Sequence, residues 1–147
     1  MNIELIETMN YQDLVPLMIQ EGLEITENTP VPEGIICCIE LLEKESGLRI
    51  GCGVVTSDSK EIVLRCAAIK KEFQKQGFGT VIVNRALEIA KENGAIRLVL
   101  TAKVPEFYKK LGFQIIPYEK YPYRNDCATC KRFHNGCNSE MMEYVFG

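Results

Sequence analysis

The first half of the chain alternates short apolar runs with polar turns. These runs predict strands at residues 3–7, 35–42, 48–55 and 61–69. The polar turn at 44–47 joins the second and third runs as an antiparallel hairpin. A meander of three strands is therefore expected between residues 35 and 69.

A helical period interrupts this pattern after the first run. Leu14, Leu17 and Met18 recur at helical spacing, and Asn10 or Asp13 is placed to cap the helix. The sequence therefore predicts an amphipathic helix between the first and second strands.

A longer helix is predicted where apolar residues recur between Ile82 and Ala90. Arg85 and Glu88 then face water, and Asn93-Gly94 ends the helix because both residues tolerate a left-handed backbone. The element that carries the candidate chemistry begins just before this helix.

The rest of the chain predicts a return to strands around one short helix. The apolar run at 96–101 is typical of a strand buried on both faces. Pro105 and Gly112 bound a short helix, and residues 113–116 and 141–146 predict closing strands. The expected fold is α/β, with a mixed central sheet flanked by helices, and residues 1–147 are expected to form a single domain.

Composition narrows the class of protein. The 147 residues are 46% hydrophobic with a formal charge of −3, which is unlike a nucleic-acid-binding protein with its basic face. The start lacks the basic and apolar pattern of a signal peptide, and no apolar run approaches the roughly 20 residues of a membrane helix. A soluble, cytoplasmic protein with neither nucleic-acid nor membrane partners is expected.

The strongest local signal is Gln74-Lys75-Gln76-Gly77-Phe78-Gly79, between a predicted strand and the long helix. A helix N-terminus offers unpaired amides and a partial positive charge, and glycines let a phosphate approach them. A tight turn is the simpler alternative. A Walker loop is excluded because Gly79 is not followed by Lys and Ser or Thr, and a dinucleotide fold because its glycines follow the first strand.

Here the chain resembles the GNAT superfamily of N-acetyltransferases. Gln74, Gly77 and Gly79 match the signature Gln/Arg-x-x-Gly-x-Gly/Ala, after the small-small-aliphatic end of a strand at 67–69. The segment 107–113 is similar to the Tyr-x-x-x-Gly-Phe motif of that family. The family often has Asn and Ala seven and four residues before this tyrosine, where this chain has Thr101 and Val104.

The resemblance implies an acetyl-CoA-dependent N-acetyltransferase with a GNAT-like fold and direct transfer in a ternary complex. Backbone amides would bind the pyrophosphate, and the pantetheine arm would lie between the strands that end near Ile69 and Thr101. The implied coenzyme-binding residues are Ala68, Ile69, Gln74, Lys75, Gln76, Gly77, Phe78, Gly79 and Thr80.

Tyr108 is the candidate general acid for the departing thiolate, since a phenol can protonate a thiolate within hydrogen-bond reach. The alternative is that its ring only packs beside Phe107 and Phe113. Glu61 is the first candidate for the general base and Glu40 the second, and a chain of water molecules needs neither. Each glutamate also fits a solvated strand position.

The cysteines fall into two groups. Cys37, Cys38, Cys52 and Cys66 lie in apolar runs, where a free thiol behaves as a small hydrophobe. Near the C-terminus, the predicted loop at 124–139 holds further cysteines and the sole histidine of the chain. A tetrahedral Zn²⁺ could be bound by four soft ligands at this spacing, Cys127, Cys130, His134 and Cys137. Reduced thiols or a redox-sensitive Cys127–Cys130 pair are the alternatives.

The acceptor is expected to be a small-molecule amine or an amino acid. A non-catalytic sensor of acyl-CoA is the main alternative, and a zinc knuckle that binds nucleic acid conflicts with the acidic charge. The sequence leaves the oligomeric state open, a homodimer included.

Overall fold

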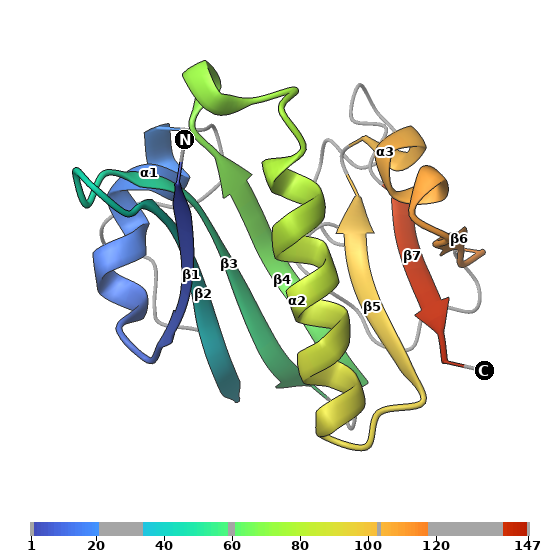
Figure 1. Cartoon of the computed structure of the whole chain (residues 1–147). Coiled ribbons are helices and arrows are strands. Elements are labelled where there is room, and N and C mark those ends of the chain that lie inside the picture. The colour runs from blue at the N-terminus through green and yellow to red at the C-terminus, as the bar shows by residue number, and fades with distance from the viewer. Residues whose placement is uncertain (1, 21–33, 59–60, 103, 118–139, 147) are drawn as a thin grey trace.

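The computed structural model describes residues 2–20, 34–58, 61–102, 104–117 and 140–146. Its described strands form a seven-stranded sheet (Figure 1). They are β1 (Ile3–Thr8), β2 (Ile35–Glu43), β3 (Arg49–Asp58), β4 (Glu61–Ile69), β5 (Arg97–Ala102), β6 (Gln114–Ile115) and β7 (Glu140–Val145). The helical segments are η1 (Tyr11–Leu14), α1 (Val15–Gln20), η2 (Lys71–Phe73), α2 (Phe78–Glu92) and α3 (Pro105–Lys110).

The spatial order of the strands is β1-β2-β3-β4-β5-β7-β6. Among the described strands only β4 and β5 pair in parallel, because α2 crosses over between them, and the other described neighbours are antiparallel. The predicted α/β fold with a mixed sheet is therefore confirmed. The C-terminal strand β7 lies between β5 and β6, so β6 becomes the edge of the sheet.

The first helical region opens with a 3-10 turn. The turn η1 precedes α1, and Asn10 makes no side-chain capping hydrogen bond. Instead, the backbone N–H of Asn10 donates to the hydroxyl of Thr8 at 3.1 Å. The predicted apolar positions Leu14, Leu17 and Met18 are all buried.

Helix α2 packs closely on one face of the sheet. Figure 1 shows the helix crossing this face. Ile82 lies against β3, at a place where the strand has Gly51 and Gly53. A Cβ added to Gly53 would lie 2.8 Å from Cγ2 of Ile82, so only glycine permits this approach. Large aliphatic side chains such as Leu41 and Leu98 fill the rest of this layer.

The other face of the sheet is covered by η1 and α1 and is rich in sulfur. Met18 packs there among Cys38, Cys52 and Tyr11, and its Sδ lies 3.3 Å from Sγ of Cys66. Burial raises the pKa of the Cys52 thiol above its ordinary value and raises that of Cys66 to about 12. These thiols stay protonated and behave as small hydrophobes, as the sequence predicts.

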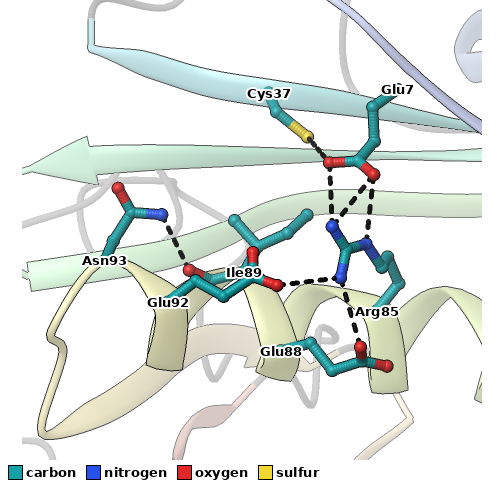
Figure 2. A network of polar contacts seen from close by, with 7 residues as sticks. All are labelled: Glu7, Cys37, Arg85, Glu88, Ile89, Glu92 and Asn93. Atoms are coloured by element: carbon teal, nitrogen blue, oxygen red, sulfur yellow. Dashed lines mark hydrogen bonds and ion pairs between the residues drawn. The ribbon is translucent and has the colours of Figure 1, made fainter.

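An ion-pair network joins the edge strand to the helix (Figure 2). Arg85 of α2 pairs with Glu7 of β1 at 3.0 Å, and with Glu88 and Glu92 on its own helix. Arg85, which was predicted to face water, lies at the surface with its side chain 22% exposed, and β1 is within its reach. Cys37 donates its thiol hydrogen to Glu7 at 3.7 Å.

Candidate functional site

The candidate site begins where β4 separates from β5. The two strands pair at Ile62–Leu98, Val63–Val99 and Leu64–Leu100. A bulge follows: Val55 of β3 pairs with Leu64 and Val54 with Cys66, so Arg65 is the extra residue. Beyond this bulge β4 continues as a partner of β3.

The end of β4 therefore has one paired edge and one open edge. Its last residues, 66–69, pair with β3 through Val54, Gly53, Cys52 and Gly51. In an antiparallel pair, about half of the peptide groups point away from the partner strand. Within residues 66–69 the amide of Lys70 and the register place Ala67 and Ile69 in this outward-facing half, so their peptide groups point toward the space between β4 and β5, where an extended ligand can take their hydrogen bonds.

The connection from β4 to α2 is held at both ends. The amide of Lys70 donates to the carbonyl of Ile50 at 2.8 Å, and the side-chain amide of Gln74 donates to the carbonyl of Ile69 at 2.9 Å. Lys75 and Gly77 then have φ values of 63° and 86°. These left-handed residues turn the chain into the helix.

The N-terminus of α2 offers free backbone donors. Gly77 is the N-cap, and the first backbone hydrogen bond of the helix runs from Val81 to its carbonyl at 3.4 Å. The amides of Phe78, Gly79 and Thr80 precede that first donor, so helix geometry leaves them without an intrahelical acceptor. No acidic residue lies in this first turn. The end of the helix therefore suits an anion.

The two glycines of this loop are accommodated for different structural reasons. A Cβ on Gly77 would meet nothing within 4 Å, so its positive φ and open surroundings fit close approach by a ligand. A Cβ on Gly79 would lie 3.3 Å from Cζ of Phe107 on α3. Gly79 thus lets α2 and α3 pack together, a role that the sequence analysis did not identify.

Tyr108 lies on α3, with its ring packed edge-on against Phe107 at 4.9 Å and Phe113 at 5.6 Å between centroids. Burial raises the pKa of the Tyr108 phenol, and the nearby Cys66 thiol raises it further, so the phenol is protonated at neutral pH. Since Cys66 directly follows the bulge, the phenol and the open end of β4 share one electrostatic environment. Packing and proton donation are compatible roles for this residue.

The two candidate bases occupy different places. Glu61 begins β4, and Arg97 binds its carboxylate at 2.8 and 3.0 Å. At about 3.3 Å per residue, Glu61 is roughly 16 Å along the strand from Cys66. This distance and the ion pair argue against Glu61 as the base.

Glu40 lies closer to the open end of β4. The register aligns Glu40 with Cys52 and Cys52 with Ala68, so these residues form one row on the α1 face of the sheet. Two strand spacings put Glu40 about 10 Å from Ala68. Glu40 is 8% exposed, and both of its contacts from the guanidinium of Arg49 go to the same oxygen, Oε1.

The predicted zinc ligands Cys127, Cys130, His134 and Cys137 lie outside the described residues. Among the residues that the structure does describe, no cluster of histidine, cysteine or carboxylate side chains could hold a metal ion. In the same described part of the chain, no helix has the length and apolar character needed to span a membrane.

Sequence comparison identifies similarity to acetyltransferases. A family model described as "Acetyltransferase (GNAT) domain" matches residues 34–115, more than half of the chain. An uncharacterised N-acetyltransferase of Chlorobaculum tepidum is 26% identical over 89 residues, which cover 58% of this chain and 57% of that protein. The chain thus spans little more than half the length of this curated relative.

Solved structures share the fold at low sequence identity. N-acetylglutamate synthase from Neisseria gonorrhoeae, complexed with coenzyme A and N-acetyl-glutamate, gives a TM-score of 0.72 at 16% identity, covering 100% of this chain and 36% of that one. The ribosomal-protein-S18-alanine N-acetyltransferase from Escherichia coli gives 0.69 at 16% identity, covering 98% and 92%. Their names state different acceptors, so the shared fold does not select one.

Proposed function

This chain belongs to the GNAT acetyltransferase family, and on that premise we propose that it moves an acetyl group from acetyl-coenzyme A to an amine. One observation carries the proposal: the open edge of β4 at residues 66–69 leads directly into the free amides at the start of α2. A long ligand with a phosphate part and an extended arm fits this combination of donors.

The residues at the start of α2 fit the pyrophosphate of the coenzyme. The backbone amides of residues 76–80 would hold it, with Gly77 leaving the approach open. Lys70, Lys71 and Lys75 add positive charge in an otherwise acidic chain. The side chains of this loop therefore contribute charge, and its backbone contributes hydrogen bonds.

The open edge of β4 fits the extended arm and the thioester. Acetyl-CoA supplies an acetyl group activated as a thioester, and an amide near Ile69 would polarise its carbonyl oxygen. The loss of such a donor typically costs about 3 kcal/mol of transition-state stabilisation. This role belongs to the backbone, so it does not depend on the side chain at 69.

Tyr108 serves as the general acid in this proposal. The amine nitrogen bonds to the acetyl carbon, the carbon–sulfur bond breaks, and the departing thiolate takes the phenol proton. The raised pKa of Tyr108 keeps that proton in place before transfer. Transfer is direct, since the raised pKa of Cys66 keeps the neighbouring thiol from acting as a thiolate nucleophile.

Glu40 is our proposal for the base, through a water molecule, in preference to Glu61. It shares the row and the face of Ala68, whereas Glu61 lies at the other end of β4. The second carboxylate oxygen of Glu40, Oε2, would accept the proton that the attacking amine releases. The distance of about 10 Å from Ala68 requires that intervening water.

The acceptor in this proposal is a small-molecule amine or an amino acid. The structural neighbour complexed with N-acetyl-glutamate supports an amino acid, while the neighbour named for a ribosomal protein makes a peptide amine the competing outcome. The zinc site at Cys127, Cys130, His134 and Cys137 remains a prediction, which metal analysis of the purified protein tests.

Two measurements test the proposal. Calorimetry with coenzyme A should give saturable binding, and a thiol-release assay with acetyl-CoA should show turnover with at least one member of a panel of amines, amino acids and peptides. Binding without turnover over the whole panel would favour the non-catalytic sensor. The absence of saturable binding at millimolar coenzyme would overturn both functions.

A further inference from the structure

One side-chain hydrogen bond joins the two parts of the proposed coenzyme site. The amide Nε2 of Gln74 donates to the carbonyl oxygen of Ile69 at 2.9 Å. Ile69 is the last residue of β4, and Gln74 directly precedes the left-handed turn at Lys75. The bond therefore connects the open edge of the strand with the start of the amide-rich turn.

On the strand side, the acceptor of this bond is the carbonyl of Ile69, whose backbone is held by β3. Ile69 pairs with Gly51 of β3, where an added Cβ would lie 2.7 Å from the carbonyl oxygen of Ala68. The neighbouring amide of Lys70 is held by Ile50 at 2.8 Å. The end of β4 thus has little freedom to move relative to β3. The side chain of Gln74 ties the loop to this fixed strand end.

On the loop side, the bond acts where the chain changes direction. Gln74 itself has an extended backbone, and the left-handed residues Lys75 and Gly77 follow it before α2 begins. Gln76 makes a hydrogen bond within the loop, from its side chain to the carbonyl of Glu72 at 3.3 Å. Of these two glutamine side chains, that of Gln74 is the one that reaches β4.

We propose that Gln74 is a positioning residue, whose side chain keeps the free amides at the start of α2 at a fixed spacing from the open edge of β4. The inference rests on the proposed function and deepens it. A coenzyme that binds both parts must place its phosphates and its thioester at one separation. The bond to Ile69 points one amide hydrogen of Gln74 back to the strand, so we assign this side chain to setting the separation and not to holding a phosphate.

The test replaces Gln74 by Met, which keeps the shape and removes the donor. With saturating acetyl-CoA, kcat should fall about tenfold because the thioester is displaced from the polarising amide. The affinity for coenzyme A should fall by a similar factor, while the affinity for ADP, which carries the adenosine and the diphosphate without the pantetheine arm, should stay within twofold. Gln74→Arg, whose guanidinium can donate to the same carbonyl, should recover most of kcat.

Gln114→Met makes the same chemical change at an exposed position in β6 and serves as the control for folding and activity. If Gln74→Met raises KM and weakens ADP and coenzyme A equally with kcat unchanged, Gln74 is a phosphate ligand and the inference is wrong. If all these quantities stay at wild-type values, the bond has no role. If wild-type protein itself fails to bind coenzyme A, the proposed function is at fault instead.

Discussion

The two ends of β4 differ in how they are held. At its beginning the strand pairs on both sides, and Arg97 of β5 joins Glu61 to Glu143 of β7 across the sheet. At its other end the strand pairs with β3, opens toward β5, and is tied to the following loop by Gln74. We refer to these as the closed end and the open end.

This difference separates structural from functional uses of one strand. At the closed end, backbone donors are used by neighbouring strands and the carboxylates are used by Arg97. At the open end, we propose that peptide groups and helix amides bind the coenzyme and that the phenol of Tyr108 donates a proton. Charged residues are therefore a poor guide to the site, and unsatisfied backbone is a better one.

The largest effect is expected from Tyr108→Phe at the open end. Loss of the phenol proton should lower kcat by about 100-fold or more, because general acid catalysis typically contributes a factor of that size. Coenzyme A affinity should change little, since the ring still packs against Phe107 and Phe113. Steady-state kinetics and calorimetry measure the two quantities.

Tyr144→Phe is the matched control, because Tyr144 also packs against Phe113, at 5.5 Å, and lies on β7. It should keep wild-type turnover. Equal turnover of both variants would show that Tyr108 only packs, and the acid would have to be sought elsewhere.

The second test compares Glu61, at the closed end of β4, with Glu40 of β2, which shares a row with Ala68 at the open end. Glu40→Gln should lower kcat/KM by about tenfold through loss of the base, whereas Glu61→Gln should stay within twofold. Each change weakens an arginine pair, so each is expected to cost about 1 kcal/mol of stability. Kinetics at a temperature well below both unfolding midpoints separates activity from stability. A large loss of activity in Glu61→Gln alone would break the distinction between the two ends.

The third test concerns backbone strain at the two ends of α2. Gly77 and Gly94 both have positive φ, at 86° and 76°, and neither has an atom near its missing Cβ. Replacing either by Ala should cost about 1–2 kcal/mol of stability. Only Gly77→Ala should also weaken coenzyme A binding, by several-fold, because in the proposed complex its turn contacts the phosphate. Equal binding by both variants in calorimetry would contradict the proposed binding of the pyrophosphate at the start of α2.

The smallest effect concerns stability in alkaline solution. Burial raises the pKa of the Cys66 thiol from 9.0 to about 12, so above pH 9 the unfolded chain loses this proton first. The contribution is fully present below pH 9 and is lost as the pH rises toward 12. Urea unfolding at pH 8 and pH 10 should therefore show a decrease that is smaller in Cys66→Ala. An identical decrease in both proteins would mean that this thiol is not buried in solution.

Much of the fold could be predicted from the sequence because its signals are local. The apolar runs and turns placed the meander, and β4 occupies the expected residues Glu61–Ile69. Gly77 and Gly94 bracket α2 as their backbone freedom predicts. The bulge at Arg65 also left a signal, since a charged residue interrupts an apolar strand there.

The chemistry of the site was less accessible from the sequence. Glu61 was favoured over Glu40 because it heads the strand of the signature, and only the register across β2, β3 and β4 puts Glu40 in the row of Ala68. Gln74 was expected to bind coenzyme, and its bond to Ile69 depends on how tightly the loop returns to the strand.

By itself, the sequence determined most of the elements, the mixed α/β class and the glycine-containing turn before α2, because hydrophobic period, glycine and helix termini act over a few residues. Only the tertiary structure decided that β7 lies between β5 and β6, that β4 opens after Leu64, and which carboxylate shares a row with Ala68. These features depend on pairing between segments far apart in the chain. Local propensity carries no information about such pairing, since each strand could satisfy its hydrogen bonds with several partners.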